Sequence, residues 1–155
     1  MDESLKNIYV VLHNVHSASK TIETAQVVYG LGFSNFVVSK AEGSAAQAGV
    51  PDANRLAMKM KCNFMVLPDL KDVLEVLSVE HPLMIASPVL VKNRLDFKKL
   101  SEQTKSGRVA IILSGSSSSF SRKEMDLGDC FSLEALVDIG PSGTAAVVLY
   151  SLLSM

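Results

Sequence analysis

The 155-residue sequence contains few cysteines and almost no net charge, and each shortage excludes a class of protein. The two cysteines, Cys62 and Cys130, lie far apart and outside any C-x-x-C spacing. This arrangement argues against a disulfide framework and against a zinc site, and it favours a reducing compartment. Because the formal net charge is -1, binding to nucleic acid would require a local basic patch or another subunit.

Long apolar runs and targeting signals are also missing. No apolar run approaches the ~20 residues needed to span a bilayer. The first residues, Met1 to Ser4, include two acids and lack the basic and then apolar order of a signal peptide. These absences predict a soluble, cytoplasmic protein without a membrane partner.

The sequence does contain an alternation of short apolar runs and helical patterns. Hydrophobic residues make up 48% of the chain and charged residues 20%, which is typical of one globular domain over residues 1–155. The predicted strands are 7–13, 36–38, 63–67, 83–86, 108–113 and 136–139. Helices are predicted at about 20–31, 55–61, 70–77, 96–105, 122–127 and 144–153, the first with Ser17 or Ser19 as its N-cap. Strands that are apolar throughout are typical of sheets covered on both faces, so we expect an α/β fold with a mostly parallel sheet.

Three predicted strands end in small or turn-forming residues. In open parallel sheets, ligands bind beyond the carboxyl ends of the strands, and small side chains let a ligand approach the backbone. An adenine ring can bind there through main-chain hydrogen bonds, with aliphatic side chains against its faces. Each turn taken alone also fits an ordinary tight turn. The residues expected at this binding site are Ala86, Ser87, Pro88, Leu113, Ser114, Gly115, Ile139, Gly140, Ser142, Gly143 and Thr144.

The motifs of several common sites are absent. The stretch GSSSSFS, from Gly115 to Ser121, lacks the spacing of G-x-x-x-x-G-K-[ST], and Ser119 stands where G-x-S-x-G needs its second glycine. No G-x-G-x-x-G follows the first strand. His13 and His16 have no carboxylate or cysteine at ligand spacing, so we interpret them as loop residues and predict no metal.

The order of these loops resembles the SpoU branch of the SPOUT superfamily, the α/β-knot RNA methyltransferases. The similarity runs from about Ile8 to Leu153 and rests on three segments, Val10 to His16, Val109 to Ser121 and Val137 to Tyr150. The resemblance implies a C-terminal trefoil knot and S-adenosylmethionine bound at the three strand ends. It also implies a homodimer formed through the first and last helices, for which the face of Ala145, Ala146, Leu149 and Leu153 is suitable. On this basis we expect an S-adenosylmethionine-dependent RNA methyltransferase acting on tRNA or rRNA.

Several motif positions depart from that family. Gln26 stands at the position of its helix arginine, Lys20 at its asparagine and Ser117 at its glutamate. Glutamine is neutral and cannot replace a guanidinium cation, which weakens the expectation of ribose methylation. The candidates near the methyl group are Asn14, Lys20, Gln26 and Ser117.

The departures leave two alternatives open. One is a non-catalytic SPOUT-like domain that binds S-adenosylmethionine or RNA without turnover. The other is an unknotted, flavodoxin-like α/β domain whose serine loop binds an anion.

Overall fold

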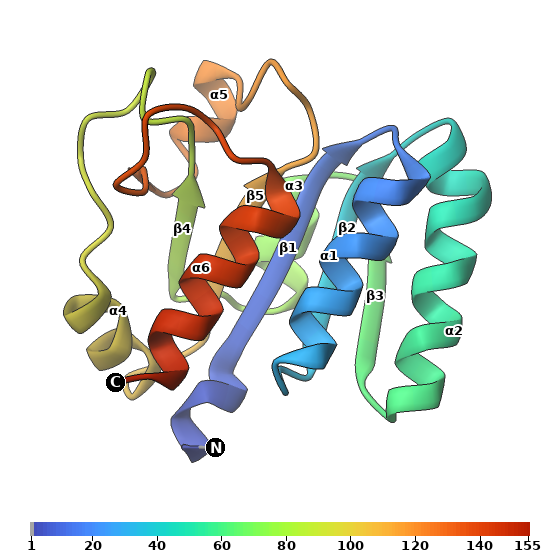
Figure 1. The fold of residues 1–155 in the computed structure, drawn as a ribbon, viewed down its shortest axis with the longest axis horizontal. Helices are drawn as coiled ribbons and strands as arrows, with labels where there is room; N and C mark the ends of the chain where they lie inside the picture. Colours follow the sequence, from blue (N-terminus) through green and yellow to red (C-terminus); the bar gives the residue numbers. More distant parts are fainter. Residues whose placement is uncertain (1) are drawn as a thin grey trace.

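The computed structural model describes residues 2–155 as a six-stranded sheet with helices on both faces (Figure 1). The strands are β1 (Ile8–Val15), β2 (Asn35–Ala41), β3 (Asn63–Leu67), β4 (His81–Ile85), β5 (Val109–Ser114) and β6 (Asp129–Phe131). Their spatial order is β3-β2-β1-β5-β4-β6, and every pairing is parallel. The expected α/β class with a mostly parallel sheet is confirmed.

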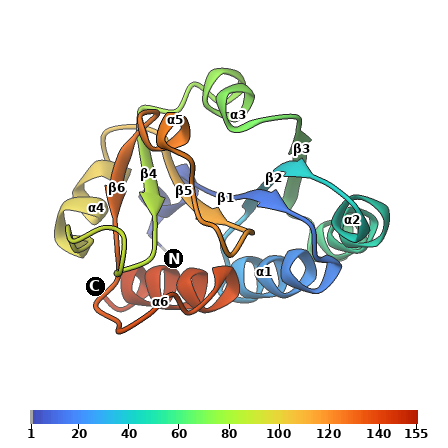
Figure 2. The same cartoon turned by 90° about the horizontal axis from the view of Figure 1, so that it is seen from above.

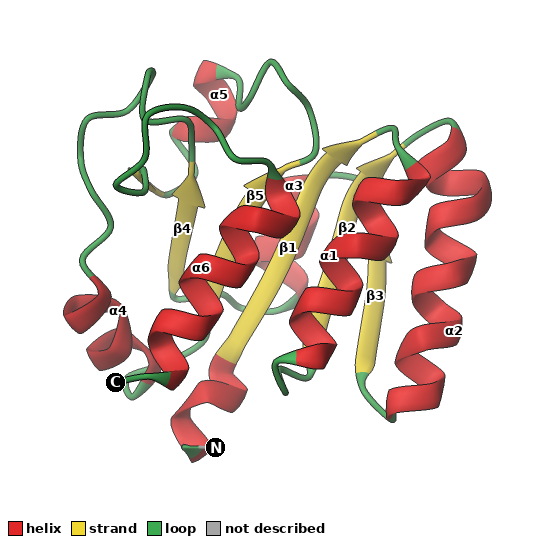
Figure 3. Cartoon of the chain, viewed as in Figure 1, coloured by secondary structure: helices red, strands yellow, loops and turns green. Residues whose placement is uncertain are grey.

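Helices cover the sheet in two layers. They are α1 (Ala18–Gly30), α2 (Val50–Met60), α3 (Leu70–Val76), α4 (Phe97–Thr104), α5 (Arg122–Met125) and α6 (Pro141–Leu153), together with a 3-10 helix at Glu3–Asn7 and a π-helix at Ala45–Gly49. Seen from above, α1, α2 and α6 lie along one face, and α3 and α5 lie on the other (Figure 2). The long connections at the top of the molecule carry α5 and lead into α6 (Figure 3).

The central strand β1 shows why its residues are apolar throughout. Val10 and Leu12 are fully buried in the cluster that also holds residues of α1 and α6. Val11, between them, is fully buried in the second cluster with Leu70 and Val73 of α3. Successive side chains of a strand point to opposite faces, so burial on both faces requires an uninterrupted apolar run.

The last predicted strand is wrong. Residues 136–139 form an irregular loop, in which the side chain of Leu136 is 93% exposed. The sixth strand is instead Asp129–Phe131, a three-residue edge strand beside β4. So short a strand of mixed polarity has no periodicity to reveal it, whereas the loop imitates a strand by its aliphatic composition.

The face of α6 assigned to a dimer is largely used within the chain. Ala145 and Leu149 are fully buried against the chain's own core, while Val147 and Tyr150 are the exposed apolar side chains of this helix. The homodimer stays a prediction. Across residues 2–155, no helix is both long enough and apolar enough to cross a membrane.

Candidate metal site

The strand order reverses between β1 and β5. From β1 the chain builds β2 and then β3 on one side, and it later places β5 on the other. In open parallel sheets such a switch point, at the carboxyl ends of the strands, is the usual position of a ligand site. His13, near the carboxyl end of β1, is paired in register with Ser39 of β2 and with Ser114 of β5.

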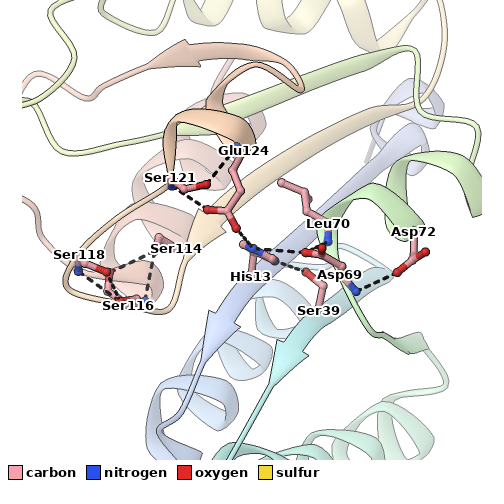
Figure 4. A network of polar contacts seen from close by, with 10 residues as sticks. All are labelled: His13, Ser39, Asp69, Leu70, Asp72, Ser114, Ser116, Ser118, Ser121 and Glu124. Atoms are coloured by element: carbon pink, nitrogen blue, oxygen red, sulfur yellow. Dashed lines mark hydrogen bonds and ion pairs between the residues drawn. The ribbon is translucent and has the colours of Figure 1, made fainter.

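His13 is the buried centre of a polar network on the α3 and α5 face of the sheet (Figure 4). Its side chain is completely buried, and both ring nitrogens have partners. Nδ1 lies 2.8 Å from the hydroxyl of Ser39, and Nε2 lies 2.5 Å from Oε2 of Glu124. Because an ionised carboxylate only accepts hydrogen bonds, Nε2–H donates to Glu124, and in neutral imidazole Nδ1 then accepts from Ser39.

Glu124 is held in place by the start of α5. Ser121 is the N-cap of this helix, and its hydroxyl accepts from the backbone N–H of Glu124 at 3.2 Å. The Oε1 atom of Glu124 accepts from the backbone N–H of Ser121 at 2.8 Å, which completes a capping box. One carboxylate oxygen therefore fixes the side chain, and the other points to His13.

The ionised form of Glu124 is favoured. Partial burial acts to raise its pKa, but hydrogen bonds from Ser121 and His13, with the charge of His13, outweigh burial and lower the pKa below its ordinary value. This carboxylate consequently stays charged in mildly acidic solution.

Asp69 supplies the third group, from the turn between β3 and α3. It is the N-cap of α3, and its Oδ1 atom accepts from the backbone N–H of Leu70 at 2.8 Å. The same oxygen lies 3.9 Å from Nε2 of His13. The side chain is 62% exposed, so Asp69 forms the solvent side of the cluster while His13 forms its buried side.

The donor set fits a divalent cation. One ligand atom from each of His13, Asp69 and Glu124 can be chosen so that all lie within 4.8 Å of one another. One imidazole nitrogen and two carboxylate oxygens suit ions such as Mn2+, Fe2+ or Zn2+, and three protein ligands leave positions for water or substrate. Holding a cation at Nε2 requires the other tautomer of His13, in which Nδ1–H donates to the Ser39 hydroxyl.

A cavity of about 500 Å³ opens beside this cluster. Its lining consists of Asp69, Glu124, Lys71, Lys123 and Leu127. The volume lies within the range of small-molecule sites, roughly 300–1,000 Å³. The cluster therefore has room next to it for a ligand, with both signs of charge on its walls.

The three turns predicted as a binding site do converge, but they leave little space. One pocket is lined by Ala86, Pro88, Ile139 and Thr144, among others, and a neighbouring one by Ser87, Leu113, Ser114, Gly140 and Thr144. Each has a volume of about 10 Å³, room for one water molecule rather than for an adenosyl group. Gly115, Ser142 and Gly143 are not among the lining residues of either pocket.

The four candidates for catalysis lie on β1, on α1 and in the serine loop. Asn14, the last residue but one of β1, has a left-handed backbone with a φ of 60°, and the ammonium group of Lys20 donates to the Gly115 carbonyl at 3.3 Å. Gln26 is exposed on α1, and Ser117 is exposed at the tip of the serine loop. Their roles remain predictions.

The serine loop satisfies its own backbone. The N–H of Ser116 donates to the Ser114 hydroxyl, and the N–H of Ser118 donates to the Ser116 hydroxyl, both at 3.2 Å. The N–H of Ser119 donates to the Ser116 carbonyl. These three donors, which an anion nest would use, already have partners within the loop.

The fold is that of known methyltransferase structures. A crystal structure described as a proposed methylase family protein from Neisseria gonorrhoeae matches with a TM-score of 0.79 and 12% identity, covering 100% of this chain and 85% of that one. The A. aeolicus TrmH/SpoU tRNA modifying enzyme matches with a TM-score of 0.63 and 13% identity, covering 97% of this chain and 77% of that one. The resemblance to SpoU-type structures is confirmed at the level of the fold, which many unrelated activities share.

Sequence similarity points to a different family. The model of the RecB-family nuclease family (DUF2122) matches residues 43–151, and the chain belongs to this family. ApeKORF2002P of Aeropyrum pernix, named as a proposed type II restriction enzyme, is 36% identical over 144 residues, which is 92% of this chain and 90% of that protein. MjaORF1200P of Methanocaldococcus jannaschii, named in the same way, is 29% identical over 149 residues, or 96% of this chain and 97% of that protein.

Three expectations are corrected by these findings. The family and its relatives carry nuclease names, so the predicted RNA methyltransferase, with its non-catalytic alternative, is wrong. The expected S-adenosylmethionine cofactor is wrong for the same reason. The predicted absence of a metal is overturned by the cluster of His13, Asp69 and Glu124.

The sequence does not reveal this cluster, because the carboxylates that approach His13 lie far from it along the chain. His13 and Glu124 are 111 residues apart in the sequence. They come close because β5, which precedes α5, pairs with β1 in the sheet. One local signal was available in the pattern Ser121-x-x-Glu124, a capping box that fixes the glutamate side chain at the start of a helix.

Proposed function

We propose that this protein is a divalent-metal-dependent nuclease whose centre is His13, Asp69 and Glu124. The observation that carries the proposal is the convergence of these three ligand-type side chains beside a cavity of about 500 Å³. The family description and the type II restriction enzyme names of the relatives support a phosphodiester substrate, with DNA as the first choice.

The residues have distinct tasks in this proposal. His13 is oriented from behind by Ser39, and Glu124 is oriented by the capping box of α5. Asp69 is the most exposed of the three groups and faces the cavity where a substrate would lie. A divalent cation held by the three groups would supply positive charge that polarises a phosphoryl oxygen.

The experiment is a cleavage assay on labelled DNA with Mn2+ or Mg2+, with EDTA as the metal-free control. We expect His13→Ala, Asp69→Asn and Glu124→Gln each to reduce the rate by at least about 100-fold, because each removes a ligand of the cation that would stabilise negative charge at the reacting phosphate. The matched control is Glu75→Gln, which removes an exposed carboxylate of α3 that does not line the cavity. Cleavage that persists in EDTA, or variants that cleave at the unsubstituted rate, would contradict the proposal.

We also propose that the C-terminal segment threads through the loop 86–95 as a knot. Support comes from Ser132, which is fully buried and whose hydroxyl donates to the Val91 carbonyl at 2.7 Å. Its N–H donates to the Asn93 carbonyl at 2.8 Å, and its own carbonyl accepts from Leu95 N–H at 2.9 Å. The test is the path of residues 127–141 in an experimental electron-density map. A path outside the loop would rule the knot out.

A further inference from the structure

Two lysines share the cavity with the acidic pair. Lys71 stands two residues after Asp69 in the first turn of α3, and Lys123 immediately precedes Glu124 in α5. Both lysines are exposed and line the cavity of about 500 Å³. Among residues 2–155, neither lysine takes part in an ion pair, so both ammonium groups are free to meet a ligand.

The charges of this cavity suit an anion once a cation is present. Two carboxylates and two ammonium groups cancel, and a divalent cation at the carboxylates leaves an excess of positive charge. Ammonium groups bind phosphate oxygens as point charges. A phosphodiester lying against the cluster would thus meet lysines from two different helices.

The overall charge of the chain does not favour a long duplex. The net charge of the chain is -1, whereas duplex-binding surfaces are strongly positive and bury roughly 1,000–2,500 Å². Two free lysines in one cavity correspond to about two phosphate contacts.

We propose that Lys71 and Lys123 form a phosphate-binding subsite for a short single-stranded DNA segment, contacted through about two phosphates. The choice of ligand rests on the proposed nuclease function. The lysines bind and position the strand, while Asp69 and Glu124 line the same cavity and His13 is buried next to these two carboxylates.

The salt dependence of binding tests this subsite without any cleavage. The probe is a fluorescein-labelled 12-nucleotide oligo-dT strand, titrated with the Glu124→Gln protein in EDTA and followed by anisotropy. Loss of the Glu124 carboxylate leaves one negative and two positive side chains in the cavity, so its net charge is positive without a cation. Each phosphate contact on a single strand contributes about −0.7 to the slope of log affinity against log salt, so two contacts give about −1.4. Affinity should then fall about sevenfold between 50 and 200 mM salt.

Substitutions separate the subsite from bulk charge. Adding Lys71→Ala and Lys123→Ala should weaken binding and bring the slope about 1.4 closer to zero, while Lys71→Arg with Lys123→Arg should keep the slope. The matched control is Lys98→Ala with Lys99→Ala, which removes the same charge from exposed positions on α4.

Three results would overturn the subsite. They are no binding of the strand to the Glu124→Gln protein, an unchanged slope after loss of Lys71 and Lys123, and an equal loss of slope in the α4 control. Since no metal or turnover enters this measurement, a failed cleavage assay with an intact salt dependence would reject the proposed nuclease chemistry and leave the subsite standing.

Discussion

His13 is the residue on which the candidate site depends. A polar side chain that is completely buried destabilises the fold unless its hydrogen-bonding groups have partners. Ser39 and Glu124 provide one partner for each ring nitrogen, so the imidazole has a fixed orientation without a cation. In metal sites, residues that hydrogen-bond to a ligating histidine fix the orientation of its ring in the same way.

The first prediction concerns Ser39, which touches only the rear nitrogen of His13. Ser39→Ala removes the group that holds the ring in place, and we expect affinity for Mn2+ to fall about 10- to 100-fold. Isothermal titration calorimetry measures the change. Ser118→Ala, at an exposed hydroxyl in the serine loop, should leave the affinity unaltered. Equal affinities in the two variants would show that Ser39 does not position a metal ligand.

The second prediction concerns acid stability and follows from the lowered pKa of Glu124. Partial burial opposes the ionised form, but the hydrogen bonds from Ser121 and His13 prevail, so the folded-state pKa lies below the ordinary value of 4.5. A carboxyl group with a lowered pKa stabilises the fold above its unfolded-state pKa, and this contribution is lost as pH falls through the folded-state pKa.

Urea unfolding between about pH 6 and pH 3 checks the sign of this effect. Unfolding free energy should fall less steeply with acidification in Glu124→Gln than in the unsubstituted protein. Glu75→Gln, at an exposed carboxylate, is the control and should keep the original steepness. The interpretation fails if Glu124→Gln and the unsubstituted protein show the same pH dependence.

At the scale of elements, helix α5 has only four residues, so its own backbone hydrogen bonds stabilise it little, yet it fixes the position of Glu124. The capping box stabilises the start of this helix, because the side chains of Ser121 and Glu124 each accept a hydrogen bond from the other residue's backbone N–H. Glu124 is therefore both a member of the capping box and a candidate metal ligand, which couples the local fold of α5 to the site.

The third prediction uses this coupling. Ser121→Ala should lower the unfolding free energy by about 0.5–2 kcal/mol and also weaken Mn2+ binding, since Glu124 loses its anchor. Asp96→Ala removes the N-cap of α4, where the carboxylate accepts from the N–H of Lys99 at 3.1 Å. This control should lose similar stability and keep its Mn2+ affinity. A normal affinity in Ser121→Ala would remove the proposed link between cap and site.

Elements with a clear pattern of apolar residues could be predicted from the sequence, and elements without such a pattern could not. The strands that became β1 and β5 are apolar runs buried on both faces, and Ser17 caps α1 as expected by accepting from the N–H of Lys20. The edge strand β6 has only three residues, one of them the charged Asp129. The loop 136–139 has aliphatic side chains but no partner strand.

At the scale of the whole molecule, the parallel sheet creates the site. Carboxyl ends of parallel strands share one edge, so His13, Asp69 and Glu124 meet although they are distributed over most of the chain. The sequence could indicate that edge, because ligands bind there in this class of fold. It could not indicate which of the side chains at the edge face one another, since that depends on strand order and on the paths of α3 and α5.

The fourth prediction tests how α6 completes the molecule. Leu149 is fully buried against the chain's own core, whereas Val147 on the same helix is 43% exposed. Leu149→Ala should lower the unfolding free energy by about 2–5 kcal/mol, and Val147→Ala should change it far less. Urea unfolding at two protein concentrations is the measurement, with one cooperative transition expected for residues 1–155. A loss in Leu149→Ala that depends on protein concentration would place this side chain in a subunit contact instead.

The most direct test of the proposed metal site is the anomalous scattering of crystals soaked in Mn2+. We expect one strong anomalous peak from an Mn2+ ion within bonding distance of His13 Nε2 and of carboxylate oxygens of Asp69 and Glu124. Crystals of His13→Ala should show no peak at this position. Soaked crystals with no peak among these three side chains, while Mn2+ binds elsewhere or not at all, would contradict the metal site and with it the proposed nuclease.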